Sequence, residues 1–438
     1  MKKLNVLIWV LLLVFTNLFA QQEKGIIGTT NWLNNWTDFQ PNKQYHREPT
    51  QIISGNITSD TKLFKRDTYL LMGSVFVTNQ ANLYIEPGTV ILGDYDSKAS
   101  LTISRGSKII AEGTETDPII FSSNRSVKKA GDWGGVIVLG DAPLNRFGNG
   151  SVANFHTQLS PGNYVNTNYG GNNTEDSSGV LKYVRIEYSG KRIKGAGYFN
   201  GLLLAGIGSK TVLDNIMVSY SAGDAFEIWG GDITLNQAVS YRASINDFKF
   251  NHGTQCRLNN SLAIRSPYIS SSEGSRCLKV LSYDRKEDVD FSKKSTLVVA
   301  KNITVLNDSE SLKEDIENGL IKEGVFIGEN AFLDMNKSVI SGFNPAVILD
   351  DRISINQSNL EKVKFTDMYF NNCNGNIFVL NNGNNDDLEN WYGNSAFFNV
   401  YSKSENIETF IDIENKRRPD YRLRINKIIA INKPDVDE

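Results

Sequence analysis

The chain of 438 residues is long enough for two or three ordinary domains or for one long array of repeats. Its 40% content of hydrophobic residues can build a large core, which excludes disorder over most of its length. The net charge is -3 and the basic residues are scattered. No patch that would follow a phosphate backbone is expected, so nucleic acid is excluded as the expected partner.

The N-terminus has the pattern of a secretory signal. Two lysines precede the apolar run Val6 to Phe15, and the small residue Ala20 comes directly before a polar segment. The run is too short for a transmembrane helix, and no later segment is long enough to span a bilayer. We therefore predict a signal peptide over residues 1–20 and an exported protein, located in the periplasm, on the cell surface or in the medium.

Short strand motifs recur along the chain after residue 51. The motif "LYIEPGTVILG" from Leu83 is followed 18 residues later by "LTISRGSKIIAEG" from Leu101. The motif "VLKYVRIEYSG" from Val180 matches "VLDNIMVSYSAG" from Val212 at an offset of 32. Residues 148–179, rich in glycine and asparagine, lie between these motifs. They are either an exposed loop or a binding loop beside the coil that starts at Val180.

The clearest echo is "VSYSAGDAFEIWGGDITLNQAVSYRASINDFKFNHG", residues 218–253. The triplet at Val218 returns at Val239, Leu262 and Leu281, in steps of 21, 23 and 19 residues. Such a step corresponds to one coil of a parallel β-helix with three short strands and their turns. Alternation places Val184 and Ile186 on one strand face. It predicts two stacked columns, one of Ile186, Val218, Val239, Leu262 and Leu281, the other of Tyr188, Tyr220, Tyr241, Ile264 and Tyr283.

The pattern continues to the C-terminal region. "VFI" at Val325 returns 22 residues later as "VIL" at Val347. A capping box at Ser311 predicts a short helix that ends near Gly319. We predict an all-β fold, a right-handed parallel β-helix over residues 52–414 with short helical and loop insertions. Residues 21–51 are expected to form an N-terminal cap, and residues 415–438 a C-terminal tail or cap.

Cys256 and Cys277 are separated by 21 residues. If this step is one coil, the two side chains lie in vertical register at about 5 Å, which a disulfide accepts. We predict a disulfide between them, the alternative being two stacked buried thiols. Cys373 has no partner in sequence and is expected to be a buried small hydrophobic residue.

Several motifs resemble those of a known family. They include "LYIEPGTVILG", "GDWGGVIVLG", "YGGNNTEDSSGVLKYVRIEYSG", "NGLLLAGIGSKTVLDNIMVSYSAGDAFEIWGG" and "KSVISGFNPAVILDD". Together they resemble exported right-handed parallel β-helix proteins of Bacteroidota with a pectate-lyase-like fold, over about residues 52–399. The resemblance implies a surface or secreted protein rather than one particular reaction. Such proteins tend to carry a denser run of aspartates where this chain has residues 246–251, so any metal site there is expected to be weakened.

Chemistry, if present, is expected around the echo. A lyase of this fold needs calcium on carboxylates and a basic side chain that removes the sugar proton. The candidate ligands are Asp224, Glu227, Asp232 and Asp247, and the candidate bases are Arg242 and Lys249. A hydrolase would instead use grouped carboxylates such as Asp224 and Asp247 as acid and base.

The same residues also have a purely structural interpretation. Phe226 and Ile228 are expected to face inward, which leaves Glu227 and Lys249 outward as a stacked pair of opposite charge. Such a pair contributes roughly 0.2–1 kcal/mol and needs no substrate. Asp224 and Asp247 also suit turn positions. This interpretation is favoured over the catalytic one.

Three tryptophans are candidate sugar platforms. Trp133 and Trp229 each precede paired glycines, and Trp391 stands in the acidic segment "NNDDLENWYGN". Packing between coils is the alternative role for the first two, and a solvated loop for the third. The sequence thus favours a non-catalytic envelope or surface module that binds a polysaccharide or an envelope protein without a cofactor. The alternative is a calcium-dependent polysaccharide lyase or a glycoside hydrolase.

Overall fold

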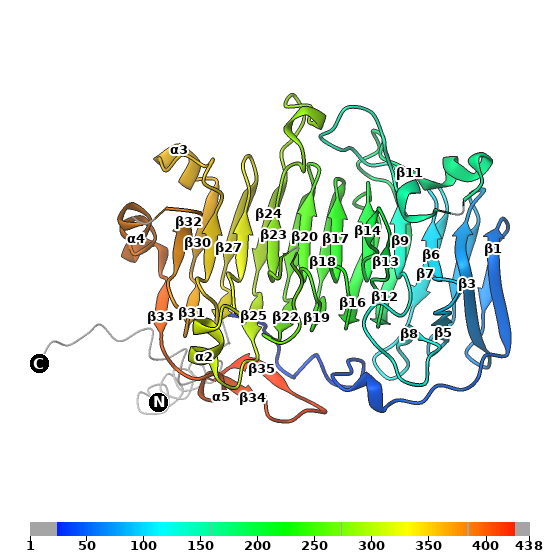
Figure 1. Cartoon of the computed structure of the whole chain (residues 1–438), viewed down its shortest axis with the longest axis horizontal. Coiled ribbons are helices and arrows are strands. Elements are labelled where there is room, and N and C mark those ends of the chain that lie inside the picture. Colours follow the sequence, from blue (N-terminus) through cyan, green and yellow to red (C-terminus); the bar gives the residue numbers. More distant parts are fainter. Residues whose placement is uncertain (1–23, 158, 273, 383–384, 425–438) are drawn as a thin grey trace, which may run out of the picture.

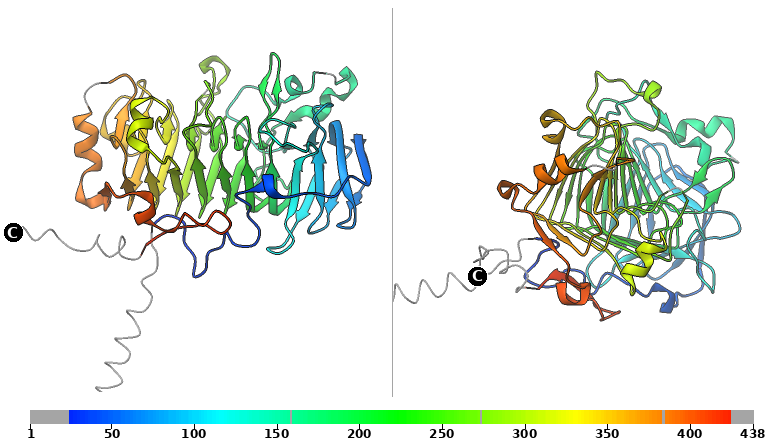
Figure 2. Two further views of the ribbon diagram at one scale, coloured as in Figure 1. Left: turned by 60° about the horizontal axis from the view of Figure 1, so that its bottom comes forward. Right: turned by 60° about the vertical axis from the view of Figure 1, so that its left-hand side comes forward.

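The chain folds into an elongated parallel β-helix, as Figure 1 and Figure 2 show. The structure is a computed structural model that describes residues 24–424 except 158, 273, 383 and 384. Within these residues, 29 strands join through parallel pairs into one continuous sheet that winds through three faces. The predicted fold class is therefore confirmed. The expected signal peptide, residues 1–20, lies outside the described residues.

Each coil passes through three parallel sheets, which we call the cavity sheet, the covered sheet and the third sheet. The cavity sheet contains β6 (Ser100–Ile103), β9 (Val136–Leu139), β15 (Leu202–Ala205), β17 (Phe226–Trp229), β20 (Phe248–Asn251), β23 (Leu278–Val280), β26 (Val325–Ile327), β29 (Val347–Leu349) and β32 (Ile377–Val379). The covered sheet contains β5 (Val90–Gly93), β8 (Ile119–Ser123), β19 (Val239–Tyr241), β22 (Leu262–Arg265), β25 (Thr304–Asn307), β28 (Val339–Ser341), β31 (Tyr369–Asn371) and β33 (Val400–Ser402). The third sheet contains β2 (Thr61–Leu63), β4 (Asn82–Ile85), β7 (Lys108–Glu112), β18 (Asp232–Asn236), β21 (Gln255–Asn259), β24 (Leu297–Lys301), β27 (Phe332–Asn336) and β30 (Val363–Thr366).

Four longer strands turn a corner between sheets. Strands β12 (Gly179–Glu187) and β16 (Val212–Ser219) run from the third sheet into the covered sheet. Strands β1 (Gln51–Ile57) and β3 (Thr68–Val77) run from the covered sheet into the cavity sheet. Three antiparallel pairs lie outside the coils: β10 (Gly150–Ser151) with β11 (Asn168–Tyr169), β13 (Arg192–Ile193) with β14 (Gly197–Tyr198), and β34 (Phe410–Asp412) with β35 (Asp420–Leu423).

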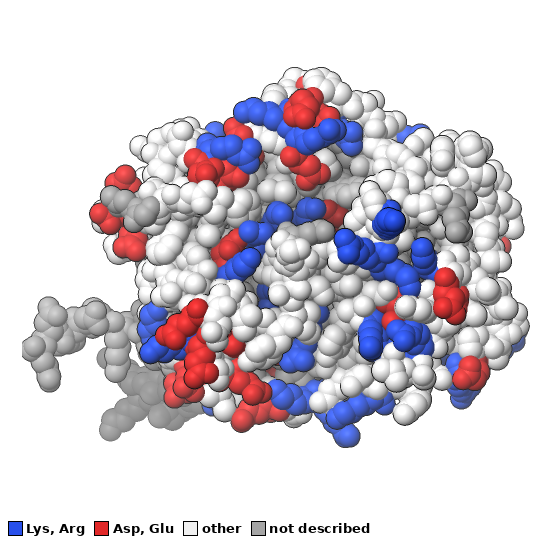
Figure 3. All heavy atoms as spheres, viewed as in Figure 1, with Lys and Arg blue, Asp and Glu red and all other residues white. Residues whose placement is uncertain are grey.

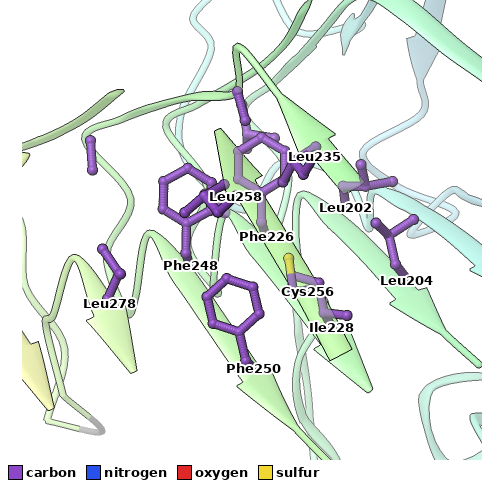
Figure 4. Close-up of a cluster of buried hydrophobic side chains, with 14 of the residues drawn as sticks. Leu202, Leu204, Phe226, Ile228, Leu235, Phe248, Phe250, Cys256, Leu258 and Leu278 are labelled. Carbon is purple, nitrogen blue, oxygen red and sulfur yellow. The ribbon is translucent and has the colours of Figure 1, made fainter. Parts of the chain in front are cut away.

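The core is a stack of inward apolar side chains, as the alternation predicts. Phe226 and Phe248 are aligned on β17 and β20, and their rings stack at 4.9 Å between centroids. Ile228 and Phe250 follow in the same register, and Leu258 approaches them from the third sheet (Figure 4). These side chains are fully buried, so the inward half of the predicted alternation at the echo is confirmed.

The register of the covered sheet differs by one residue from the predicted column. Ile186 pairs with Val218 as expected, but Val218 pairs with Ser240, while Val239 pairs with Met217. A slip of one residue turns side chains to the opposite face. Val239 and Leu262 therefore point away from the core, into a second apolar cluster. Matching similar letters missed this slip, because the coil is one residue longer than the echo of "VSY" suggests.

The second predicted column forms in part. The rings of Tyr188 and Tyr220 stack at 5.5 Å, and Tyr241 meets Tyr220 edge to face at 5.6 Å. Leu281 and Tyr283 do not belong to either column, because they follow β23 in the cavity sheet. The last step of the sequence echo is therefore wrong.

Helices lie at the surface and at one end of the β-helix. They are α2 (Leu312–Glu317), α3 (Gln357–Leu360), α4 (Asp386–Tyr392) and α5 (Asn406–Thr409), with 3-10 turns at Pro41–Lys43, Ala153–Phe155, Pro161–Thr167, Lys286–Asp288 and Ser395–Phe397. Helix α2 is where the capping box predicts it, although the Ser311 side chain makes no capping hydrogen bond. Helix α4 lies over the C-terminal end (Figure 1) and inserts Leu388 and Tyr392 into the core. No helix in the described part of the chain is both long and apolar enough to cross a bilayer.

Residues 24–50, which we call the strap, run along the outside of the covered sheet instead of over an end of the β-helix (Figure 1). Lys24 forms an ion pair with Asp367 at 2.8 Å, near the last coils. Further on, Trp36 is fully buried, and Gln44 accepts a hydrogen bond from Arg185 at 2.7 Å. The C-terminal hairpin β34–β35 packs beside the strap in the same apolar cluster. The expected N-terminal cap is therefore a lateral cover.

Cys256 and Cys277 are free buried thiols, so the predicted disulfide is wrong. Cys256 lies on β21 in the third sheet, aligned with Ile233 and Val298. Cys277 directly precedes β23 in the cavity sheet. The chain between them makes an excursion over residues 266–276, so a step of 21 residues does not return to the same sheet. Cys373 is a buried free thiol, as expected.

Candidate functional site

A cavity of about 470 Å³ lies on the outer face of the cavity sheet, above β17, β20 and β23. The molecular face in Figure 3 is hollowed over these strands, and acidic and basic side chains lie in the hollow. Its floor comes from the sheet and its walls come from insertions between strands. The residues that matter below are Asn200, Asp224, Glu227, Trp229, Lys249, His252, Lys279 and Asp284.

Two insertions meet at one side of the cavity. Arg146 and Val289 form an isolated antiparallel bridge, and the Phe147 N–H donates to the Asp288 carbonyl at 3.2 Å. The Asp290 N–H donates to the Asn145 carbonyl at 2.8 Å. Backbone hydrogen bonds between two loops limit the motion of both. This clasp closes the cavity near the carboxyl ends of β17 and β20.

The glycine- and asparagine-rich stretch supplies an aromatic wall. Phe155 stacks on Trp229 at 6.4 Å and on Phe199 at 5.2 Å. Tyr169 lies 5.7 Å from Trp229, between ring centroids. Phe155, Tyr169 and Trp229 all line the cavity. Of the two alternatives left open for residues 148–179, the structure therefore favours a loop that builds a site.

Glu227 and Lys249 form the centre of the floor. They are aligned on neighbouring strands, and Lys249 Nζ lies 2.6 Å from Glu227 Oε1. Asn200 Nδ2 donates to the other Glu227 oxygen at 2.5 Å. The predicted stacked pair of opposite charge is confirmed, with both side chains largely withdrawn from solvent. Burial alone would lower the pKa of Lys249, but the Glu227 and Asp224 carboxylates raise it overall.

Asp224 lies beside this pair at the amino end of β17. Its Oδ1 accepts from the Asn246 N–H at 2.8 Å and from Asn246 Nδ2 at 2.7 Å. Its Oδ2 lies 3.9 Å from Lys249 Nζ. Burial raises the pKa of Asp224 to about 6, although the Lys249 ammonium opposes that change. A fraction of this carboxyl group is therefore protonated near neutral pH.

Two further basic groups complete the site. Lys279 follows Lys249 in register on β23, and among the described residues it makes no ion pair. Burial lowers the pKa of Lys279, and nearby Lys249 and Arg276 lower it further. His252 Nε2 lies 3.5 Å from Asp284 Oδ2, and burial lowers the pKa of this imidazole as well. The cavity thus holds cations, carboxylates and aromatic rings within one enclosure.

The other predicted catalytic residues are not part of this site. Asp247 is fully buried and is bound by Ser240 Oγ at 2.5 Å and Arg265 Nη1 at 3.0 Å. It follows Asn246, the residue aligned with Asp224, so it points to the opposite face of the strand. Arg242 pairs with Asp308 at 2.8 Å beside the covered sheet. The predicted pairings of Asp224 with Asp247 and with Arg242 are therefore wrong.

The predicted calcium ligands are dispersed as well. Asp224 and Glu227 share the cavity, but Asp232 lies on the third sheet, where it pairs with Arg257 at 2.5 Å. Asp247 is already neutralised by Arg265. Within residues 24–424, apart from the positions not described, no group of three or more His, Cys, Asp or Glu side chains is arranged to hold a metal ion.

Of the three predicted tryptophan platforms, one lies at the cavity. Trp133 is fully buried, stacks on Phe121 and donates its Nε1–H to the Glu187 carbonyl at 2.8 Å, so its predicted binding role is wrong. Trp229 lines the aromatic wall. Trp391 lies on α4 at the C-terminal end, packed against Phe397, and is not part of the cavity.

Sequence reasoning missed several residues of the site, among them Asn200, Asn246, His252, Lys279 and Asp284. A usable signal existed for Lys279, because "LKV" at 278–280 repeats the apolar, lysine, apolar pattern of "FKF" at 248–250. His252, expected as a turn residue, does adopt a positive φ of 56°. Its position in the cavity depends on the clasp, which no local pattern predicts.

The chain belongs to the family described as pectate-lyase-like β-helix domain, which matches residues 55–408. No curated protein matches the chain. Among solved structures, it is similar to the enzymatically active domain of tailspike protein 2 of bacteriophage CBA120, with 12% identity and a TM-score of 0.26. That comparison covers 77% of this chain and 42% of the tailspike chain. The full-length tailspike protein 2 of the Escherichia coli O157:H7 bacteriophage is similar at 13% identity and a TM-score of 0.24, over 77% of this chain and 38% of the tailspike.

Proposed function

We propose that this protein is an exported, non-catalytic module that binds a saccharide in the cavity above β17, β20 and β23. The observation that carries the proposal is the cavity itself, in which Trp229 and Tyr169 form an aromatic wall over a floor of Glu227, Lys249 and Lys279. Aromatic faces pack against the C–H faces of sugar rings, and charged or amide groups bind their hydroxyls. Export is supported by the signal-like residues 1–20.

The proposal is tested with the mature chain and a panel of xylan, cellulose, alginate and polygalacturonate, each with and without calcium. Binding is measured by titration calorimetry, and product by unsaturated-uronate absorbance and new reducing ends. We expect binding without product. The variant Trp229→Ala should weaken binding, whereas Trp391→Ala, a tryptophan outside the cavity, should not. Absence of binding across the panel would refute the proposal.

Glycoside hydrolysis is a second candidate, favoured by one observation. Burial raises the pKa of Asp224 to about 6, in the range where a carboxylic acid can donate a proton at neutral pH. The ionised partner would be Glu227, which Lys249 neutralises. In this case new reducing ends would appear with the wild-type protein. They would be lost in Asp224→Asn while binding is retained.

A further inference from the structure

The two ends of the cavity differ along the axis of the β-helix. On the N-terminal side, the outward residues of the cavity sheet are Ile137 and Leu139 on β9 and Leu203 and Ala205 on β15. They are at most 2% exposed, because residues from the 144–169 insertion and the 193–199 hairpin cover them in one apolar cluster. The aromatic wall at Phe155 and Trp229 is the edge of this cover. A ligand in the cavity cannot continue along the sheet in this direction.

On the C-terminal side, the outward positions continue as an uncovered row. Lys249 is aligned with Lys279, then with Phe326, Ile348 and Phe378. Lys279, Ile348 and Phe378 are half-buried, with one face of each side chain open to solvent. Four strand spacings separate Lys249 from Phe378, which is roughly 19 Å at about 4.8 Å per strand.

The middle of this row is held rigidly. The guanidinium of Arg276 lies 4.9 Å from the ring centroid of Phe326, and its Nε bonds Glu323 at 2.5 Å. Phe326 is therefore only 8% exposed, and the planar guanidinium takes its place at the surface. A planar cation stacked on a ring is itself a flat surface against which a sugar ring packs.

We infer that the cavity receives one end of a saccharide chain and that the following sugar units lie along Lys279, Arg276, Ile348 and Phe378. This inference rests on the proposed function and adds a direction to it. The chain end is stopped by the aromatic wall at Trp229, and the chain leaves toward the C-terminal coils. The protein thus recognises chain termini, and internal segments of a polymer are excluded from the cavity.

The first test measures affinity against ligand length. The probes are the disaccharide, tetrasaccharide and hexasaccharide prepared from each polysaccharide that binds in the panel. We expect affinity to rise with length in the wild type. Phe378→Ala and Ile348→Ala should each remove about 5- to 10-fold of that gain while leaving the disaccharide affinity unchanged. Val299→Ala, at an outward, half-buried position of the third sheet, is the matched control and should change neither value.

The second test concerns the chain end. The hexasaccharide carries a bulky fluorophore either at its reducing end or at its non-reducing end. One of the two tags should abolish binding, because its end enters the cavity, and the other should be tolerated. Equal tolerance of both tags would overturn the inference while leaving saccharide binding intact. Affinity independent of length, or unchanged in Phe378→Ala, would overturn the path along the row. A failure of all untagged probes to bind would instead refute the proposed function.

Discussion

The covered sheet and the cavity sheet belong to the same coils but present opposite outer faces. On the covered sheet, the outward residues Met217, Val239 and Leu262 are apolar and at most 1% exposed, because the strap and the C-terminal hairpin lie over them. On the cavity sheet, the outward residues Glu227, Lys249 and Lys279 are charged and form the floor of a cavity. Outward on a β-helix therefore does not mean exposed to solvent.

The difference shows how a regular scaffold gains a site. Both faces alternate inward and outward with the same period, since the pleat imposes it. A face with apolar outward residues needs a cover, which the chain supplies from residues 24–50 and 410–423. A face with charged outward residues needs partners, which neighbouring strands and insertions supply. Four variants test this contrast.

Removal of the strap's main anchor should have the largest effect. Trp36 is fully buried against the covered sheet, with its ring 5.9 Å from that of Tyr183. Trp36→Ala should lower the free energy of unfolding by about 3–5 kcal/mol, because it leaves a cavity in a packed cluster. Urea denaturation followed by circular dichroism measures this. Tyr45→Ala, a strap residue that is 98% exposed, is the control, and equal stability of the two variants would contradict the cover.

On the cavity sheet, loss of one charge should cost nearly as much. Lys249→Met leaves the buried Glu227 carboxylate with Asn200 but no cation. We expect a loss of about 3 kcal/mol in the free energy of unfolding, since an unpaired buried charge is poorly solvated. The double variant Lys249→Met with Glu227→Leu should recover most of it. A single variant as stable as the wild type would show that the pair is solvated.

Asp224 should make stability depend on pH. Its pKa in the folded protein, about 6, lies above the ordinary value of 3.8, so the folded chain holds the proton more tightly than the unfolded chain. The resulting stabilisation is complete below about pH 4 and is lost as the pH rises through 6. Between pH 4 and 7 the wild type should lose about 2 kcal/mol relative to Asp224→Asn. Parallel curves for the two proteins would contradict the raised pKa.

The smallest effect is expected on the third sheet. Arg257 and Asp232 form a stacked pair of opposite charge like that of the cavity floor, but Arg257 is 47% exposed in its side chain. Arg257→Met should change the free energy of unfolding by about 0.5 kcal/mol or less, because water screens the pair. A loss as large as that of Lys249→Met would remove the contrast between the exposed and enclosed pairs.

Local sequence patterns were sufficient for the fold and for part of the site. Alternation at residues 226–228 and 248–250 predicts the inward phenylalanines and the outward Glu227–Lys249 pair, and the structure has both. Patterns were insufficient wherever the length of a coil mattered. The pairing of Cys256 with Cys277 and the column through Val239 both assumed a constant step, and both fail at insertions or one-residue slips.

What the sequence by itself determined is the parallel β-helix and the direction of side chains within each strand, because both follow from a short period set by the backbone. What only the tertiary structure decided is which residues meet across coils. Asp224 lies with Glu227 and Lys249 whereas Asp247 does not, and Trp229 faces a cavity whereas Trp133 is buried. These outcomes depend on register and on two clasped insertions, which are contacts between segments far apart in the chain.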